Sequence, residues 1–187
     1  MNSISTVEDH IIEKAQALFG NTLSAAEVLP SALNLAVLKQ LVASNRTPGV
    51  YTTFLGGQGN SRGSLNGRFD VYVITRHVGN HSARRRGDTT TIGAYDILAA
   101  LIPKLHDSTI AGVGSLELKN VRNLFSMQLE QSFKATMYAV TFELPNMPFP
   151  NDFDPSTLAD FVTFHAEHSL VDGDDEPDAI DHITLEQ

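Results

Sequence analysis

Residues 49–57, GVYTTFLGG, and residues 68–76, RFDVYVITR, are the stretches of the sequence that decide the fold. In the first, β-branched and aromatic side chains follow one another with the two-residue alternation of a β-strand. In the second, both alternating sets of side chains are largely apolar, which is typical of a strand covered on both faces. The two stretches therefore predict a sheet with the second strand near its centre.

Apolar residues at helical spacing predict a helix on the N-terminal side of these strands, at 6–19. Ser5 and Glu8 have the spacing of a capping box at its start. A short strand at 25–29 and a short helix at 35–42 are expected before the first of the two central strands.

A second amphipathic helix is expected beyond the strands, where residues 92–105 carry an apolar stripe. Thr90 or Thr91 can cap its first turn. Pro103 fits poorly inside a helix, so the sequence predicts either a kink in the last turn or an end near Leu101.

Two further strands are expected at 115–126 and 133–142. Pairs of strands on either side of a helix indicate an α+β fold. The predicted architecture is a mixed, largely antiparallel sheet of about four to five strands, with helices packed on one face.

The 187 residues suffice for one domain followed by an appendage. Pro145, Pro148 and Pro150 mark a boundary, which predicts an α+β domain at 1–147 and an arm at 148–187. The arm contains 11 of the 22 acidic residues and no lysine or arginine, so it carries a charge of −11, whereas the preceding domain carries +2.

Inside the acidic arm, residues 155–170 have the pattern of a short helix. Residues 171–177, VDGDDEP, are too charged to fold alone. We therefore expect the arm to become ordered by contact with another copy of the chain.

The glycine-rich segment between the central strands, GGQGNSRGSLNG at 56–67, is a candidate phosphate-binding loop. Its spacing matches neither G-x-G-x-x-G nor G-x-x-x-x-G-K-[ST], and a strand follows it where a phosphate site needs a helix N-terminus. The segment is therefore expected to be a mobile hairpin loop that projects from the sheet and becomes ordered against a partner.

Six of the eight arginines lie in one 25-residue span, four of them in a predicted flexible loop at 76–91. Guanidinium groups pair with carboxylates and phosphates, so the span is a candidate interface with a neighbouring subunit or with the DNA backbone inside a channel. A solvated loop is the alternative. The net charge of −9 and the lack of a nucleic-acid-binding motif disfavour base reading. The six residues are Arg62, Arg68, Arg76, Arg84, Arg85 and Arg86.

Histidines and carboxylates near the end of the chain are the candidate metal ligands. His165 and His168 flank Glu167, and an acidic run at 172–178 follows. The histidine spacing differs from the i, i+4 arrangement of a helical zinc protease, and the acidic run lacks the spacing of an EF-hand. A metal-dependent enzyme is therefore kept only as an alternative, and the sequence predicts no catalytic residue, no metal and no cofactor.

The chain contains no cysteine, which excludes a thiol nucleophile and a disulfide framework. Its longest apolar run is far shorter than a membrane-spanning helix needs, and the first ten residues lack the features of a secretory signal. These observations predict synthesis in the cytoplasm and no contact with a membrane.

The order of several segments resembles the small tail protein family of Mu-like bacteriophages and prophages. The resemblance covers most of the chain, including its C-terminal part. The segments are PGVYTTFLGG (48–57), RFDVYVITR (68–76), GAYDIL (93–98), VRNLFSMQLEQSFKATMYAVTFEL (121–144), DFVTFHAEHSL (160–170) and DAIDHITLEQ (178–187).

The resemblance implies a structural virion protein of the tail terminator or tail completion type. Copies of such a protein would form a ring, sixfold by the same resemblance, that caps the head-proximal end of the tail tube, stops its polymerisation and offers a surface to the neck. The implied partners are other copies of the chain, the tail tube and sheath proteins, a neck or head-completion protein, and DNA in the channel. Association with Mu-like phages implies a contractile tail. A neck or baseplate connector without length control is the alternative role.

Overall fold

The computed structural model describes residues 2–30, 33–61, 63–76, 81–88, 91–124 and 132–149, and two further strands at 163–168 and 179–184. The chain divides into two compact units, Met1–Pro150 and Asn151–Gln187. The elements in chain order are α1 (Ser3–Phe19), a 3-10 turn (Gly20–Thr22), β1 (Ala25–Val28), α2 (Leu35–Ala43), β2 (Gly49–Gly59), β3 (Leu65–Arg76), α3 (His81–Arg86), α4 (Ala94–Leu105), β4 (Thr109–Ile110), β5 (Gly114–Ser115), β6 (Glu117–Asn123), β7 (Ala135–Met147), β8 (Thr163–His168) and β9 (Ala179–Thr184).

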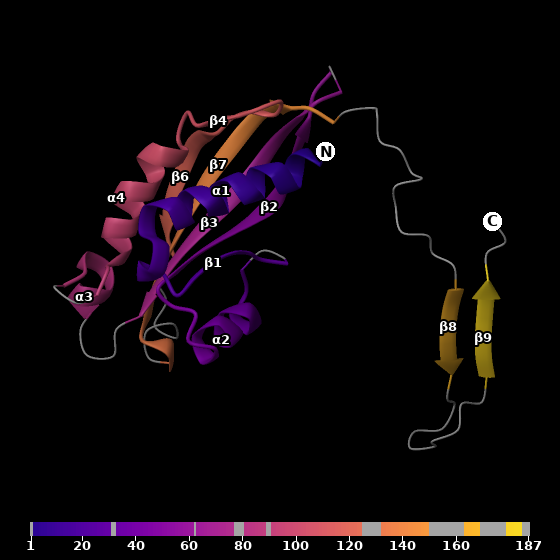
Figure 1. Cartoon of the computed structure of the whole chain (residues 1–187), viewed down its shortest axis with the longest axis horizontal. Coiled ribbons are helices and arrows are strands. Elements are labelled where there is room, and N and C mark those ends of the chain that lie inside the picture. Colours follow the sequence, from indigo (N-terminus) through magenta and orange to yellow (C-terminus); the bar gives the residue numbers. More distant parts are fainter. Residues whose placement is uncertain are drawn as a thin grey trace. The chain divides into compact units, whose positions relative to one another are not determined.

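The first unit is built on a five-stranded sheet with the strand order β1-β2-β3-β7-β6 (Figure 1). β1 runs parallel to β2, and the other neighbouring strands are antiparallel. The predicted α+β class and mixed, largely antiparallel sheet are confirmed, and β3 is the central strand, as its two apolar faces indicated.

Two helices cover one face of the sheet. α1 lies across the strands with α4 beside it (Figure 1), and their apolar stripes join the inward side chains of the sheet in one hydrophobic core. Val7, Ile11 and Ala15 of α1 are fully buried in this core. Full burial of a valine or isoleucine contributes about 1.5–3 kcal/mol, so this stripe fixes the helix on the sheet.

A second, smaller core lies on the opposite face, so the helices are not all on one side. Leu38, Leu41 and Val42 of α2 pack with alternate strand residues such as Tyr51 and Tyr72. Strand side chains alternate between faces, and this is why neighbouring residues of β2 and β3 belong to different cores. Charged and polar side chains such as Arg68, Arg122 and Glu143 lie on another part of this face.

Glu8 of α1 completes the hydrogen bonding of β2 beyond the end of β1. β1 pairs with β2 as far as Thr52. Beyond that point Phe54 N–H, on the side of β2 where β1 has ended, donates to Glu8 Oε1 at 2.9 Å. The predicted capping box at Ser5 and Glu8 is therefore wrong, because this carboxylate is used by the sheet. The helix instead begins earlier, where Asn2 Oδ1 accepts from Ile4 N–H.

The glycine-rich segment is largely strand, which corrects the expectation of a long mobile loop at 56–67. β2 continues to Gly59 and β3 begins at Leu65, with Gly57 opposite Gly67. Backbone pairing needs no side chains, and a bulge after Phe54 absorbs the change in register. The connecting turn is closed by a hydrogen bond from Asn60 N–H to Ser64 O at 2.9 Å.

The second amphipathic helix begins at Ala94, and Gly93 is its N-cap in place of Thr90 or Thr91. Asp96 Oδ2 accepts from Gly93 N–H at 3.1 Å. A side chain at Gly93 would place its Cβ 2.0 Å from the backbone nitrogen of Gly87, so glycine is required at this close approach.

The helix α4 continues past Pro103 to Leu105, so the alternative end near Leu101 is wrong. Proline removes one helical hydrogen bond, but only two residues follow it before the helix ends. Leu105 is fully buried in the main core, and its burial offsets the missing bond.

Two other expectations are corrected. The segment at 76–91 contains the short helix α3, held to the sheet by a hydrogen bond from Thr75 Oγ1 to Arg84 O at 2.6 Å. In the second unit, part of the predicted helix at 155–170 is instead β8, which forms an antiparallel hairpin with β9. Residues 171–177 lie outside the described residues.

The end of β7 is tied to two other parts of the first unit. Ser3 Oγ donates to Pro148 O at 2.7 Å, which joins the start of α1 to the point where the first unit ends. Asn60 Nδ2 donates to Asn146 Oδ1 at 2.9 Å from the turn between β2 and β3. These hydrogen bonds hold the C-terminal end of β7 beside that turn and the start of α1.

The interaction of Glu8 with the sheet predicts a pH-dependent effect of the substitution Glu8→Gln. Burial raises the pKa of Glu8, and the hydrogen bond from Phe54 opposes the rise. A carboxyl whose folded pKa is raised costs stability when ionised, and this cost disappears as the pH falls below the unfolded value. Glu8→Gln should therefore raise the free energy of unfolding above that of the wild type most at about pH 7.5 and only slightly at about pH 4. Urea unfolding at the two pH values measures this difference.

Glu13→Gln, on an exposed position of the same helix, is the matched control and should show a smaller dependence on pH. A gain for Glu8→Gln that is the same at both pH values would contradict the assignment of this carboxyl to a partly desolvated site.

Candidate functional site

The structure describes five of the six arginines that the sequence placed in one candidate interface, and it separates them. Arg68 and Arg76 lie on the same strand, eight residues apart, which is roughly 26 Å at about 3.3 Å per residue. Arg84, Arg85 and Arg86 belong to α3. Arg62 lies outside the described residues. These five arginines therefore lie in two separate places, Arg68 in the first half of β3 and the other four at its C-terminal end.

The arginines of α3 differ in exposure. Arg84 is buried, with 3% of its surface exposed, and its backbone oxygen is bound by Thr75. Arg85 and Arg86 are exposed. The candidate interface at this end of the sheet therefore consists of Arg85 and Arg86 with the half-buried Arg76.

Two tyrosines adjoin this arginine pair. Tyr138 of β7 donates a hydrogen bond to Tyr95 of α4 at 3.3 Å, and their rings meet edge to face with centroids 5.8 Å apart. Burial and the hydrogen bond to Tyr95 raise the pKa of Tyr138 to about 12. The hydrogen bond from Tyr138, followed by the positive charge and hydrogen bond of Arg85, lowers the pKa of Tyr95. This end of the sheet thus presents cations beside a 40% exposed aromatic ring.

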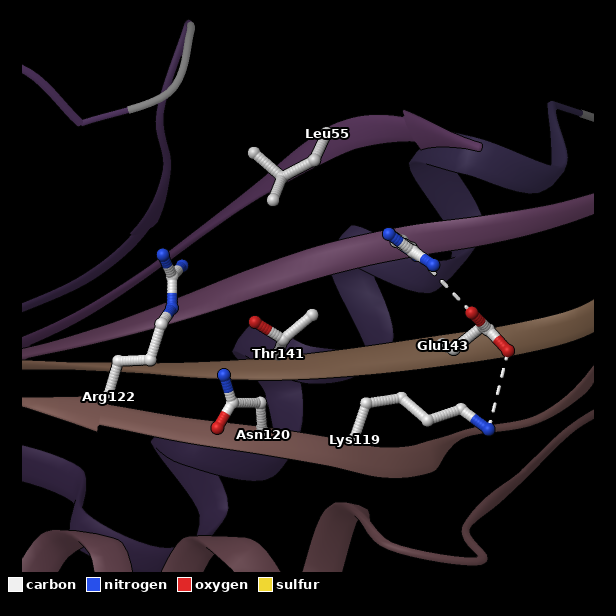
Figure 2. A pocket seen from close by; sticks show the side chains of 7 residues that line it. Leu55, Lys119, Asn120, Arg122, Thr141 and Glu143 are labelled. Carbon is white, nitrogen blue, oxygen red and sulfur yellow. Dashed lines mark hydrogen bonds and ion pairs between the residues drawn. The ribbon is translucent and has the colours of Figure 1, made fainter. Parts of the chain in front are cut away.

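The other candidate site is a pocket of about 430 Å³ on the polar part of the face that carries α2. It lies over β2, β3, β7 and β6, and Figure 2 shows Arg122 and Glu143 on opposite sides of Thr141. Its lining residues are Leu55, Arg68, Lys119, Asn120, Arg122, Thr141 and Glu143.

A buried carboxylate supports one side of this pocket. Asp70 of β3 is 1% exposed, and it accepts hydrogen bonds from Thr141 Oγ1 at 2.6 Å and Tyr72 Oη at 3.2 Å. Arg122 Nη2 lies 2.7 Å from Asp70 Oδ2, and the arginine side chain is 47% exposed. Burial, followed by the negative charge of Asp70, raises the pKa of Tyr72, so the phenol remains a donor.

A second carboxylate, Glu143, joins the strands on the other side of the pocket. Its two oxygens lie 3.3 Å from Arg68 Nε and 3.3 Å from Lys119 Nζ. Lys119 also contacts Glu117 at 2.6 Å, and the two carboxylates raise the pKa of the lysine. The three cations of the pocket are therefore each paired with an acidic group of the same sheet, and the pair of Arg122 with Asp70 spans β7.

The arrangement at the pocket suits recognition by charge and shape. Its ionic groups bind one another across the sheet while keeping part of their surface in solvent, so they can exchange partners when another surface approaches. Among the described residues, no group of three or more histidine, aspartate or glutamate side chains is placed to hold a metal ion. The side chains of His165 and His168, the metal alternative, lie outside the described part.

Sequence reasoning missed the pocket, although one signal for it was present. Asp70 is an ionisable residue in an otherwise apolar strand, and an acid at such a position needs donors from neighbouring strands. The identity of those donors depends on the pairing of β3 with β7 and of β7 with β6. Thr141 and Arg122 lie more than 50 positions away in the sequence, so no local pattern connects them to Asp70.

A family model described as Bacteriophage Mu, Gp37 matches residues 3–147. The chain belongs to this family. The matched residues include all five strands of the main sheet and the helices that cover it. The resemblance to a Mu-like phage family that was read from the order of segments is confirmed.

A relative of the Gp37 type is the Mu-like prophage FluMu protein gp37 of Haemophilus influenzae. It is 27% identical over 177 residues, which cover 94% of this chain and 85% of the relative. The aligned stretch is longer than the first unit, so it also includes much of the acidic second unit. Among the helices in the described ranges, none combines the length and apolarity that a membrane crossing requires.

The buried carboxylate predicts that Arg122→Met destabilises this Gp37 family member. The substitution leaves Asp70 with fewer donors for a charge that stays buried, and we expect a loss of about 1–3 kcal/mol in the free energy of unfolding. Asp70→Asn removes the charge, so the double variant should lose less than the sum of the single losses by about 0.5–3 kcal/mol. Urea denaturation of the four proteins measures this coupling.

Arg68→Met is the control for the same pocket. Its side chain is 55% exposed, and Glu143 keeps Lys119 as a second partner, so the expected loss is below about 1 kcal/mol. Equal losses for Arg68→Met and Arg122→Met, or strictly additive effects of the Asp70 and Arg122 substitutions, would show that the buried charge does not organise this face.

Proposed function

We propose that the protein is a structural component of the virion that caps the head-proximal end of the phage tail tube. In this role a ring of copies, sixfold by analogy with tail terminators, stops tail polymerisation and provides the surface to which the neck joins. The partners are other copies of the chain, the tube and sheath proteins of a contractile tail, and a neck or head-completion protein. The protein therefore acts in the tail or neck of the virion after synthesis in the host cytoplasm.

Membership of the Mu Gp37 family is the observation that carries this proposal. The FluMu relative, which aligns with nearly the whole chain, is named for a Mu-like prophage. A structural role, in contrast to an enzymatic one, agrees with this membership and with the surface pairing of the ionic groups at the pocket.

The architecture supports a role in assembly. A sheet with two helices on one face and a third on part of the other is a rigid platform, and it places Arg85 and Arg86 at one end. In a ring, this end would face either acidic groups of the next subunit or the DNA backbone in the channel. Contact with DNA of this kind would depend on charge and would read no bases.

A neck or baseplate connector without length control is the second structural candidate. It would use the same platform and the same exposed cations, and it differs from a terminator in its effect on tail length. The metal-dependent alternative at His165 and His168 requires a bound metal, so metal analysis of the purified protein separates it from both structural roles.

Disruption of the gene in a phage that encodes this protein tests the proposal. Electron microscopy of the lysates should show tails that are longer than normal and lack heads, because nothing stops polymerisation of the tube. Tails of normal length without heads would favour the connector, and complete virions would exclude a structural role.

The exposed arginines of α3 give a sharper test. Arg85→Ala combined with Arg86→Ala should leave the thermal unfolding of the purified protein nearly unchanged and impair the assembly of tails in a complementation assay. Arg84 stays unchanged in this variant because it is buried, and its loss would affect folding. The control replaces Arg46, whose side chain is 47% exposed, and the exposed Lys39 of α2, which lie outside both candidate sites. Equal complementation by both double variants would remove Arg85 and Arg86 from the interface.

A further inference from the structure

The second unit contains a β-hairpin that lacks a sheet to join. β8 and β9 pair with each other over six residues each and form a two-stranded sheet separate from the five-stranded one. An isolated two-stranded hairpin is only marginally stable in water, and it needs further strands or a packed face for stability. The hairpin is therefore a segment whose stability depends on a partner.

The main sheet has an edge that fits such a partner. β6 is the last strand of the sheet, and in the described part of the chain its backbone pairs with β7 alone. Its first outward amide is satisfied by His106, whose Nδ1 accepts from Leu118 N–H at 3.2 Å. The following residues, 119–122, are exposed, and they present a stretch of edge to which a strand can add.

The opposite edge of the sheet fits less well. β1 has only four residues, whereas β6 has seven. An added strand at β1 would gain few hydrogen bonds. The edge of β6 is therefore the better template for strand addition, which is the route by which exposed edges recruit a further strand.

The distribution of charge favours pairing of the hairpin with the main sheet over pairing of two hairpins. The hairpin lies in a segment that carries −11, whereas residues 1–147 carry +2. Pairing of two hairpins with each other would bring two strongly acidic segments together, and the repulsion would oppose it. Lys119 and Arg122 lie on β6, with side chains 41% and 47% exposed, so the edge of the main sheet offers cations to an acidic partner.

We infer that the β8–β9 hairpin of one copy adds to the edge of β6 in a second copy. The five-stranded sheet of each subunit is then extended by the arm of its neighbour, and each arm gains the sheet that it lacks. This inference deepens the proposed ring by naming the two surfaces that join its copies, and it rests on self-association of the chain. It does not require the ring to be placed on a tail tube.

Disulfide cross-linking tests the pairing, because the chain has no cysteine of its own. Val121→Cys places a thiol on β6, and Ala166→Cys or Ala179→Cys places one on the hairpin. The two single variants are mixed as full-length proteins, one with a tag that separates mixed dimers from dimers of identical chains. After mild oxidation, non-reducing electrophoresis measures the yield of the mixed dimer.

Val28→Cys is a matched control, since Val28 and Val121 are both 42% exposed on edge strands. At least one hairpin variant should form roughly tenfold more mixed dimer with Val121→Cys than with Val28→Cys, because docked strands hold the thiols at a high effective concentration. Similar yields for the two edges would overturn the inference. The inference would also be overturned if the disulfide formed within a chain that carries both cysteines but never between two single variants, because the hairpin would then pair with its own chain.

The outcome is independent of the test of the tail role. Cross-linking uses purified protein, whereas tail length is scored in lysates of a phage that lacks the gene. A specific cross-link together with normal virions would keep the strand addition and reject the terminator. Overlong tails without a specific cross-link would support the terminator and reject the strand addition.

Discussion

The carboxylate of Asp70 is buried in the sheet, and the arrangement of three strands depends on keeping it hydrogen-bonded. Its donors come from β7 and β6 as well as from its own strand. A shift of one residue in the pairing of β3 would turn Asp70 toward the apolar core beneath α1 and α4, where an ionised group is costly. The buried charge therefore specifies the register of β3, β7 and β6 more sharply than apolar side chains could, because apolar packing tolerates substitution of one side chain by another.

The two faces of the sheet then take different roles. One face is closed by α1 and α4 over a single apolar core, which contains most of the buried hydrophobic residues described in the first unit. The other is divided between the small core under α2 and a set of ion pairs that stay partly in solvent. Apart from Asp70 and its donors, these exposed ion pairs add little stability, so this part of the surface can serve contacts with other molecules at small cost to the fold.

Much of this architecture could be predicted from the sequence because the strands and helices carry strong periodic patterns. The alternation in 49–57 and 68–76 predicted β2 and the central position of β3, and the apolar stripes predicted α1 and α4. The errors arose where tertiary contacts override local preference. Glu8 serves the sheet and not its own helix, and glycines that suggested a loop are held in strands by backbone pairing.

The candidate sites were less predictable than the fold. The clustering of arginines along the chain suggested one interface. An extended strand rises about 3.3 Å per residue, however, so Arg68 and Arg76 lie far apart on β3 although they are close in sequence. Conversely, Asp70, Arg122 and Thr141 come together only through strand pairing over long sequence distances. Such contacts become visible only when the order of strands is known.

The position of β7 has a mechanical consequence. β7 lies between β3 and β6, and its C-terminal end leads directly to the junction with the second unit. A force applied to the C-terminal end of β7 along the strand axis would load the hydrogen bonds to both neighbouring strands in shear, all at once. A strand pulled from the edge of a sheet could be unzipped one bond at a time. The chain thus connects its C-terminal segment to the sheet through an interior strand, where resistance to extension is shared between two strand interfaces.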